Sequence, residues 1–216
     1  YVNGIGWHEK FDSQLWSEST HLIGKDILKT HAVYWTTMLL ALGIPPYKSL
    51  QVGGYWLMSG TKMSKSLGNV LRPLEVEGTY GKDTLRFFLL KEMSYGLDSS
   101  FSLEGYVACV NAHLANGIGN LVSRVMTLCQ KNFKGSFDLK TLTTVDKTLL
   151  DVRKTTLETW NESFEQLKYQ LALKAWTDMV SKVDMYVSEM KPWALAKDPT
   201  QEERLQTVLG VCLVMI

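Results

Sequence analysis

Short apolar runs ended by glycine or proline mark the first part of the chain. Residues 21–26 read as a short buried strand that ends in a glycine turn. A helix is predicted from 26 to about 42, where Gly43 and two prolines stop it. Residues 50–57 are typical of one further strand, and 72–77 of a short helix. The first part of the chain therefore combines strands with helices.

From about residue 101 the pattern changes to long helices, because apolar residues recur every three or four positions. The first apolar stripe is Leu103, Val107, Val110, Leu114, Ile118, Leu121, Val125 and Leu128. A second helix is predicted at about 145–161. The next stripe is Phe164, Leu167, Leu171, Ala175, Met179, Val183, Tyr186 and Met190. Short connections between such helices favour an antiparallel bundle.

The run 208–216 is apolar but too short to span a bilayer. It predicts a core helix, and we expect this helix to continue beyond the chain, which would then be part of a longer protein. No membrane partner is expected.

Composition excludes little, since 45% hydrophobic and 21% charged residues are ordinary for a globular protein of 216 residues. The net charge of +1 gives no overall attraction for nucleic acid, so any RNA contact must be made by local groups. Cys109, Cys129 and Cys212 are far apart and form no C-x-x-C motif. This spacing favours neither a zinc site nor a disulfide framework, so we expect small apolar core residues in a reducing compartment.

The segment 60–69 carries Lys62 and Lys65 three residues apart, with Ser64 beside them and a glycine near each end. Two ammonium groups with hydroxyl and backbone donors can stabilise a phosphate chain whose negative charge grows as a bond breaks. A solvated basic turn is the usual explanation of two lysines at this spacing.

Other side chains in the first part are open to two interpretations. Asp26 would lie beyond the carboxyl end of a strand, where α/β sheets bind ligands, but a simple N-cap explains it as well. His31 and Trp35 share a helix face, and such a pair is more often core packing than a pocket wall.

In the second part, Asn120 and Arg124 lie one helical turn apart beside the apolar stripe, and Pro192 lifts Trp193 out of a helix. Asn and Arg can contact bases and phosphates, and a tryptophan face can stack on an unpaired base. From the residues alone, a tryptophan that caps the core and a solvated arginine are the more ordinary explanation.

Several of these segments resemble the methionyl-tRNA synthetases, of the bacterial and organellar type. The run 62–66 resembles the second signature of class I aminoacyl-tRNA synthetases, and 21–35 is similar to the strand–helix block of the methionine enzymes. Residues 119–124 and 191–197 resemble their anticodon-helix and anticodon-stacking motifs. The sequence departs from the family pattern at Thr30, at Thr36 and at Val52-Gly53-Gly54.

The resemblance implies a three-part organisation. Residues 1–80 would be the C-terminal part of a Rossmann-like catalytic domain, 81–100 a stem, and 101–216 most of a helical-bundle anticodon domain.

The resemblance also implies an activity, in which ATP with Mg²⁺ activates L-methionine to methionyl-adenylate for transfer to tRNA(Met). The implied catalytic residues are Lys62 and Lys65. The implied ATP-binding residues are Gly24, Asp26, Lys62, Ser64 and Lys65. The implied methionine-binding residues are Tyr1, Ile27 and His31, and the implied anticodon-binding residues are Asn120, Arg124 and Trp193.

The first family signature, His-x-Gly-His, and the usual zinc-bearing insertion are not in this sequence. We therefore expect that these 216 residues alone make no adenylate, that they need the N-terminal half of the catalytic domain, and that they hold no zinc. Another class I synthetase (for isoleucine, valine, leucine or cysteine) and a non-catalytic tRNA-binding adaptor remain alternatives. The expected location is the cytoplasm or the mitochondrial matrix.

Overall fold

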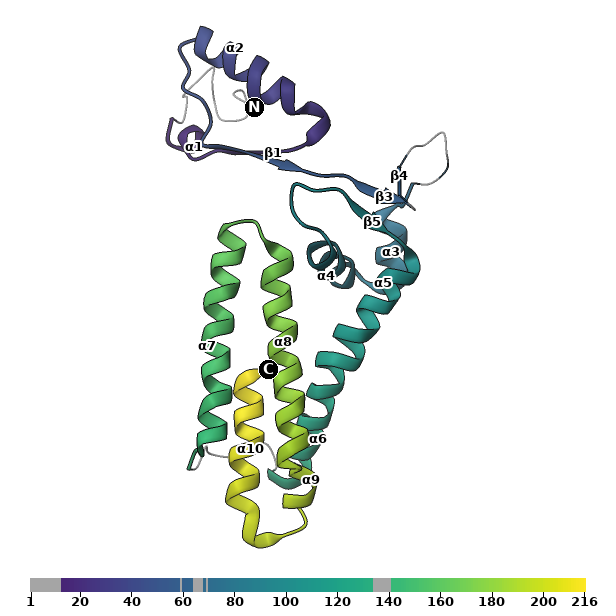
Figure 1. Ribbon diagram of the computed structural model, residues 1–216, viewed down its shortest axis with the longest axis vertical. Helices are drawn as coiled ribbons and strands as arrows, with labels where there is room; N and C mark the ends of the chain where they lie inside the picture. The colour runs from purple at the N-terminus through teal and green to yellow at the C-terminus, as the bar shows by residue number, and fades with distance from the viewer. Residues whose placement is uncertain (1–12, 59, 64–67, 69, 134–140) are drawn as a thin grey trace. The chain divides into compact units, whose positions relative to one another are not determined.

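The computed structural model describes residues 13–58, 60–63, 68, 70–133 and 141–216. The chain forms two compact units, one of residues 1–70 with 94–100 and the other of residues 71–93 with 101–216 (Figure 1). These are called unit 1 and unit 2 below. The functional division into catalytic part, stem and anticodon part stays a prediction.

Unit 1 is built on a parallel strand pair, β1 (Thr20–Gly24) and β2 (Ser49–Gly53). The crossover between them contains the 3₁₀ turn η2 (Lys25–Ile27), the π-helical segment η3 (Thr30–Trp35) and α2 (Thr36–Ala41). The predicted strand and helix are therefore confirmed. A short helix α1 (Ser13–Ser17) precedes β1. Its Trp16 packs with Leu39 and Ile44 in a small core, and donates a hydrogen bond of 2.7 Å to the Pro45 carbonyl.

The prediction of a single strand over 50–57 is wrong. Strand β2 ends before Gly54, and the chain then begins a second strand, β3 (Trp56–Met58). Strand β3 lies between β4 (Thr61–Lys62) and β5 (Ser99–Phe101), and its pairing with β4 is antiparallel. A Cβ atom at Gly54 would lie 2.0 Å from the Leu97 carbonyl oxygen. The break therefore follows from a close backbone approach that only glycine permits.

Unit 2 consists of helices. They are α3 (Pro73–Tyr80), α4 (Lys82–Glu92), α5 (Leu103–Val110), the π-helical η5 (Asn111–Gly119), α6 (Asn120–Phe133), α7 (Thr144–Glu165), α8 (Tyr169–Met190), α9 (Pro192–Leu195), the 3₁₀ turn η6 (Pro199–Gln201) and α10 (Glu202–Met215). From α5 to α6 the chain is one helical run, and Gly117 inside it departs from helical backbone angles. Figure 1 shows α7 and α8 as an antiparallel hairpin with α10 beside them. The predicted bundle, the short helix after 72 and the C-terminal core helix are confirmed.

The core of unit 2 joins α6, α7, α8 and α10. Its most enclosed members are Val125, Val183, Val208, Leu209, Val211 and Cys212. Cys109, Cys129 and Cys212 are free and buried, which confirms them as apolar core residues. Burial raises the pKa of the Cys212 thiol to about 12.

Two predicted apolar stripes need correction. Leu103 is exposed, and the buried face of α5 carries Tyr106 and Cys109 instead. The later stripe is divided between two helices, because α7 ends at Glu165 and the chain turns through Leu167, which has a positive φ of 58°. Leu171 is exposed as well.

A buried carboxylate ties three helices of unit 2 together. Asp146 has no exposed surface, and the Arg204 guanidinium donates to its two oxygens at 2.5 and 2.9 Å. The Tyr186 hydroxyl donates to it at 2.5 Å and the Thr143 backbone N–H at 2.8 Å. Burial by itself raises the pKa of Asp146, but these hydrogen bonds outweigh it and hold the pKa well below the usual range.

Among the described residues, no helix is long and apolar enough to cross a membrane.

Candidate functional site

The turn that follows β1 brings Gly24 and Asp26 together. A Cβ atom at Gly24 would lie 2.7 Å from a carboxylate oxygen of Asp26, so a side chain at this position would displace the Asp26 carboxylate. Gly24 itself is the N-cap residue, and Asp26 lies exposed within the first turn. The N-cap interpretation of Asp26 is therefore wrong. Its carboxylate lies in the first turn after β1, and a ligand role for it stays a prediction.

Ile27 and His31, two of the residues predicted to contact methionine, lie one turn apart on this helical segment. The Nδ1 atom of His31 is 3.0 Å from the Ile27 carbonyl oxygen, and Ile27 is 41% exposed. Trp35 donates a hydrogen bond of 2.9 Å to Nε2 of His21. Burial, and then the neighbouring His31, lower the pKa of His21. Trp35 and the buried His21 therefore lie beside His31, whose ring centroid is 6.2 Å from that of His21.

Of the lysine segment, Lys62 is described, whereas Ser64 and Lys65 lie outside the described residues, as does Tyr1. Lys62 is exposed in β4, and its ammonium nitrogen lies 4.2 Å from the centroid of the Tyr55 ring. The structure thus places one of the two predicted catalytic lysines, and places it against an aromatic ring.

Three residues of this cluster were missed by the sequence analysis, namely Lys25, Tyr55 and Asp98. The Lys25 ammonium lies 4.5 Å from the Tyr55 ring centroid and donates to both oxygens of Asp98 at 2.7 Å. The hydrogen bond from Lys25, with that from the Tyr55 N–H, lowers the pKa of Asp98. No local pattern could have revealed these contacts, because Lys25 and Asp98 are 73 residues apart.

The three predicted anticodon residues lie in unit 2. Asn120 begins α6 and is exposed, and Arg124 follows one turn later. The Arg124 guanidinium lies over the Trp193 ring at 5.8 Å from the centroid, although these residues come from distant parts of the sequence. Arg124 also donates a hydrogen bond of 2.6 Å to Asp184, which the sequence analysis missed.

The backbone explains why Trp193 faces outward. Lys191 has a left-handed conformation with φ of 47°, and Pro192 is buried at the first position of α9. Trp193 keeps 43% of its surface exposed. The interpretation of Trp193 as a residue that caps the core is therefore wrong. The interpretation of Arg124 as a simply solvated charge is also wrong, because Arg124 contacts Asp184 and the Trp193 ring.

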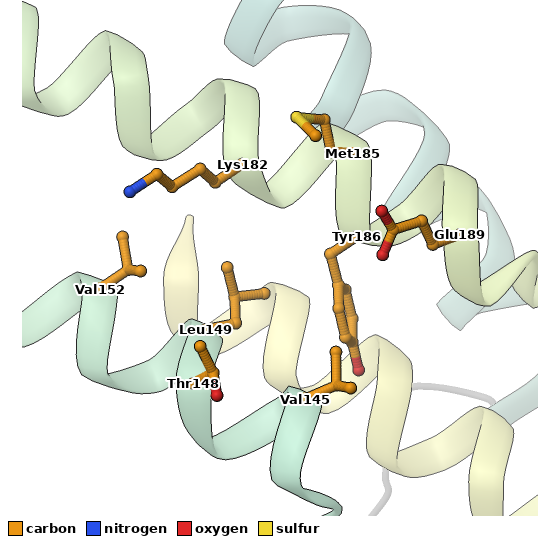
Figure 2. Close-up of a pocket in the computed structure, with 8 residues that line it drawn as sticks. All are labelled: Val145, Thr148, Leu149, Val152, Lys182, Met185, Tyr186 and Glu189. Carbon is orange, nitrogen blue, oxygen red and sulfur yellow. The ribbon is translucent and has the colours of Figure 1, made fainter.

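A groove between α7 and α8 contains none of the predicted site residues (Figure 2). Its volume is about 350 Å³, and its lining surface is mainly apolar, with Lys182 and Glu189 at the α8 side. The hydroxyl of Tyr186 is turned away to the buried Asp146. In the part of the chain that the structure describes, no group of three or more His, Cys, Asp or Glu side chains is placed to hold a metal ion.

Comparison with known proteins adds independent evidence. The family model of class I tRNA synthetases (M) matches residues 3–126. The methionine–tRNA ligase of Bacillus subtilis is 36% identical over 97% of this chain and 32% of its own length. That of Clostridium perfringens is 37% identical over 97% of this chain and 33% of its own length.

Among solved structures, Mycobacterium tuberculosis methionyl-tRNA synthetase in complex with methionyl-adenylate matches with a TM-score of 0.94 and 33% identity. The match covers 100% of this chain and 43% of that chain. This chain spans about a third of the length of the curated relatives it matches. Because the family model covers more than half of the sequence, this chain belongs to the family of class I tRNA synthetases (M).

Proposed function

We propose that the full-length protein is a methionine–tRNA ligase, acting in the cytoplasm or the mitochondrial matrix. The observation that carries the proposal is the agreement of two independent sites with one activity. Unit 1 presents Lys62 in the predicted signature at the end of a strand, and unit 2 presents an exposed tryptophan against an arginine. Identity of 36% to a methionine–tRNA ligase over 97% of the chain supports it further.

In the first step, a carboxylate oxygen of methionine attacks the α-phosphorus of ATP. The bond from this phosphorus to the bridging oxygen breaks, and pyrophosphate leaves with the electron pair. Lys62 and Lys65 would stabilise the charge that grows on the leaving group, because fixed cations favour the transition state over the ground state. Mg²⁺ would enter with ATP as part of that substrate.

The turn after β1 would hold the nucleotide and the amino acid. Gly24, which has no side chain, would let a ligand approach the backbone closely, and the exposed Asp26 can accept hydrogen bonds from ribose or amine groups. Ile27 offers apolar surface, and a ring edge such as that of His31 contacts a thioether favourably. Ser64 and Tyr1 complete the proposed ATP and methionine contacts.

In the second step, a hydroxyl at the tRNA 3′ end attacks the methionyl carbonyl carbon, and AMP leaves. Recognition of tRNA(Met) would take place on unit 2. Trp193 can stack on an unpaired base, Asn120 can pair with a base edge, and Arg124 can stack or contact phosphate.

The test is methionine-dependent exchange between ATP and pyrophosphate in the full-length protein, with Lys65→Ala beside the wild type. We expect loss of several orders of magnitude in the variant, because a charge at the leaving group acts mainly in the transition state. Lys154→Ala, an exposed lysine on α7, is the matched control and should exchange normally.

Three outcomes would contradict the proposal. If exchange depends on isoleucine, valine, leucine or cysteine instead of methionine, the protein is another class I synthetase. A wild type that binds tRNA(Met) without any exchange is an adaptor. If Lys65→Ala exchanges as fast as the wild type, Lys65 takes no part in the reaction.

A further inference from the structure

The Tyr55 ring receives two cations. The Lys25 ammonium lies 4.5 Å from its centroid and the Lys62 ammonium 4.2 Å, both within the usual distance of a cation–π contact. These lysines come from η2 and β4, and the ring comes from the break between β2 and β3. All belong to unit 1.

The backbone holds this ring in place. The Tyr55 N–H donates to Asp98 at 2.8 Å, and the Tyr55 carbonyl accepts from the Ser99 N–H at 2.9 Å. The missing side chain at Gly54 allows the two backbone segments to approach this closely. The ring therefore stands at a fixed point beside the beginning of the lysine segment.

The two lysines share the ring, and Lys25 has a carboxylate beside it as well. Both oxygens of Asp98 accept from Lys25 at 2.7 Å, so the charge of Lys25 is paired with a carboxylate. The Tyr55 ring attracts the Lys62 ammonium at 4.2 Å from its centroid and adds no negative charge of its own. A ring contact can therefore position an ammonium without neutralising it.

We propose that Tyr55 is a positioning residue that holds the Lys62 ammonium ready for the leaving pyrophosphate, while Asp98 retains Lys25 on the ring through its carboxylate. This inference rests on the proposed function and goes beyond it, because it assigns a role to residues outside the lysine signature. Tyr55 acts through Lys62 and its ring, and its hydroxyl takes no part.

The test compares Tyr55→Leu with Tyr55→Phe in ATP–pyrophosphate exchange by the full-length protein. Leucine removes the ring, so we expect kcat to fall about two- to five-fold, the range of a cation–π contact at an exposed site. KM for methionine should stay unchanged. Phenylalanine keeps the ring face and should restore the wild-type rate.

A second comparison separates positioning from general damage to the fold. In a Lys62→Ala background, Tyr55→Leu should cause no further loss, because the group it positions is already gone. The proposal is overturned if leucine exchanges like the wild type, if phenylalanine is as slow as leucine, or if the two substitutions act independently.

A magnetic-resonance measurement keeps this inference distinct from the proposed function. The Lys62 ε-methylene signal, assigned through Lys62→Arg, should be shifted by the ring in the wild type and in Tyr55→Phe, and unshifted in Tyr55→Leu. A wild type without exchange overturns the proposed function and the positioning role together. An unshifted lysine signal in an active wild type overturns the Tyr55 role alone.

Discussion

The two units support their candidate functional side chains in different ways. In unit 1 these side chains stand on a turn and on strand ends. Of the residues described there, Trp16, Leu39 and Ile44 form the buried core beside the helical crossover. In unit 2, Arg124 and Trp193 stand on helices that cover an extensive apolar core. The first arrangement depends on a few polar contacts, and the second on packing.

In unit 2 the side chains proposed to contact tRNA differ from those that stabilise the fold, whereas in unit 1 one side chain can serve both purposes. Trp193 is 43% exposed, and the core beneath it does not include its ring. In contrast, Asp98 both closes the turn at Tyr55 and neutralises Lys25, so one side chain serves structure and electrostatics together. Substitutions should therefore have separable effects in unit 2 and coupled effects in unit 1.

The largest expected effect is that of Asp146→Ala on the stability of unit 2. The change leaves the Arg204 guanidinium and the Tyr186 hydroxyl without their buried acceptor. We expect the free energy of unfolding to fall by about 3 kcal/mol, somewhat reduced by the partial exposure of Arg204. Urea titration followed by far-ultraviolet circular dichroism measures this loss in the helices.

The matched control is Asp151→Ala, an exposed aspartate on the same helix, which should change stability by less than about 0.5 kcal/mol. Equal losses in both variants would mean that the buried network contributes nothing special. Unit 2 would then be held together by its apolar core without help from this network.

The next effect is that of Trp193→Ala on tRNA(Met) affinity. Loss of one stacked base costs about 1–3 kcal/mol, which weakens binding about five- to 150-fold at constant salt. The unfolding free energy should change little, because 43% of Trp193 is exposed and the apolar core described for unit 2 does not include its ring. Titration of the full-length protein with tRNA(Met), beside thermal unfolding, measures both quantities.

Two further variants sharpen this result. Trp193→Phe keeps a ring for stacking and should retain most of the affinity. Trp160→Ala removes another partly exposed tryptophan, one that stacks on Phe164 in α7, and should lower stability without weakening tRNA binding. Lower stability in Trp193→Ala with unchanged affinity would show that Trp193 supports the fold and reads no base.

The sequence predicted those features that depend on local pattern. Helical periodicity located the crossover helix of unit 1 and the helices of unit 2, and Pro192 marked the turn that exposes Trp193. The residues proposed to read the anticodon were chosen through motif resemblance, and the structure brings two of them, Arg124 and Trp193, into contact.

What the sequence did not predict depends on partners distant in the chain. The stripe through Leu103 was wrong because the buried face of α5 is decided by α4, where Phe88 meets Tyr106 at a ring distance of 5.3 Å. The strand break at Gly54 depends on the approach of Leu97. In the same way, Asp146 reads as an ordinary helix N-terminal residue until Arg204, 58 positions later, lies against it.

The smallest expected effect is the response of the two units to acid. Asp98 in unit 1 and Asp146 in unit 2 both have a pKa below the usual value of a carboxyl. A lowered folded pKa contributes stability that is complete above the unfolded pKa near 4, and is lost as the pH falls below it. For Asp146 we expect a loss of up to about 1.4 kcal/mol per pH unit below pH 4, seen as easier urea unfolding of the helices.

Neutral variants assign this acid response to its source. Asp146→Asn removes the titrating group, so its helical unfolding should depend less on pH below 4 than that of the wild type. Asp98→Asn should leave the acid dependence of the helices unchanged, because Asp98 belongs to unit 1 and is bonded to Lys25 and Tyr55 there. If both variants flatten the acid response of the helices equally, the two units unfold as one cooperative structure, and stability in unit 2 is not independent of the site in unit 1.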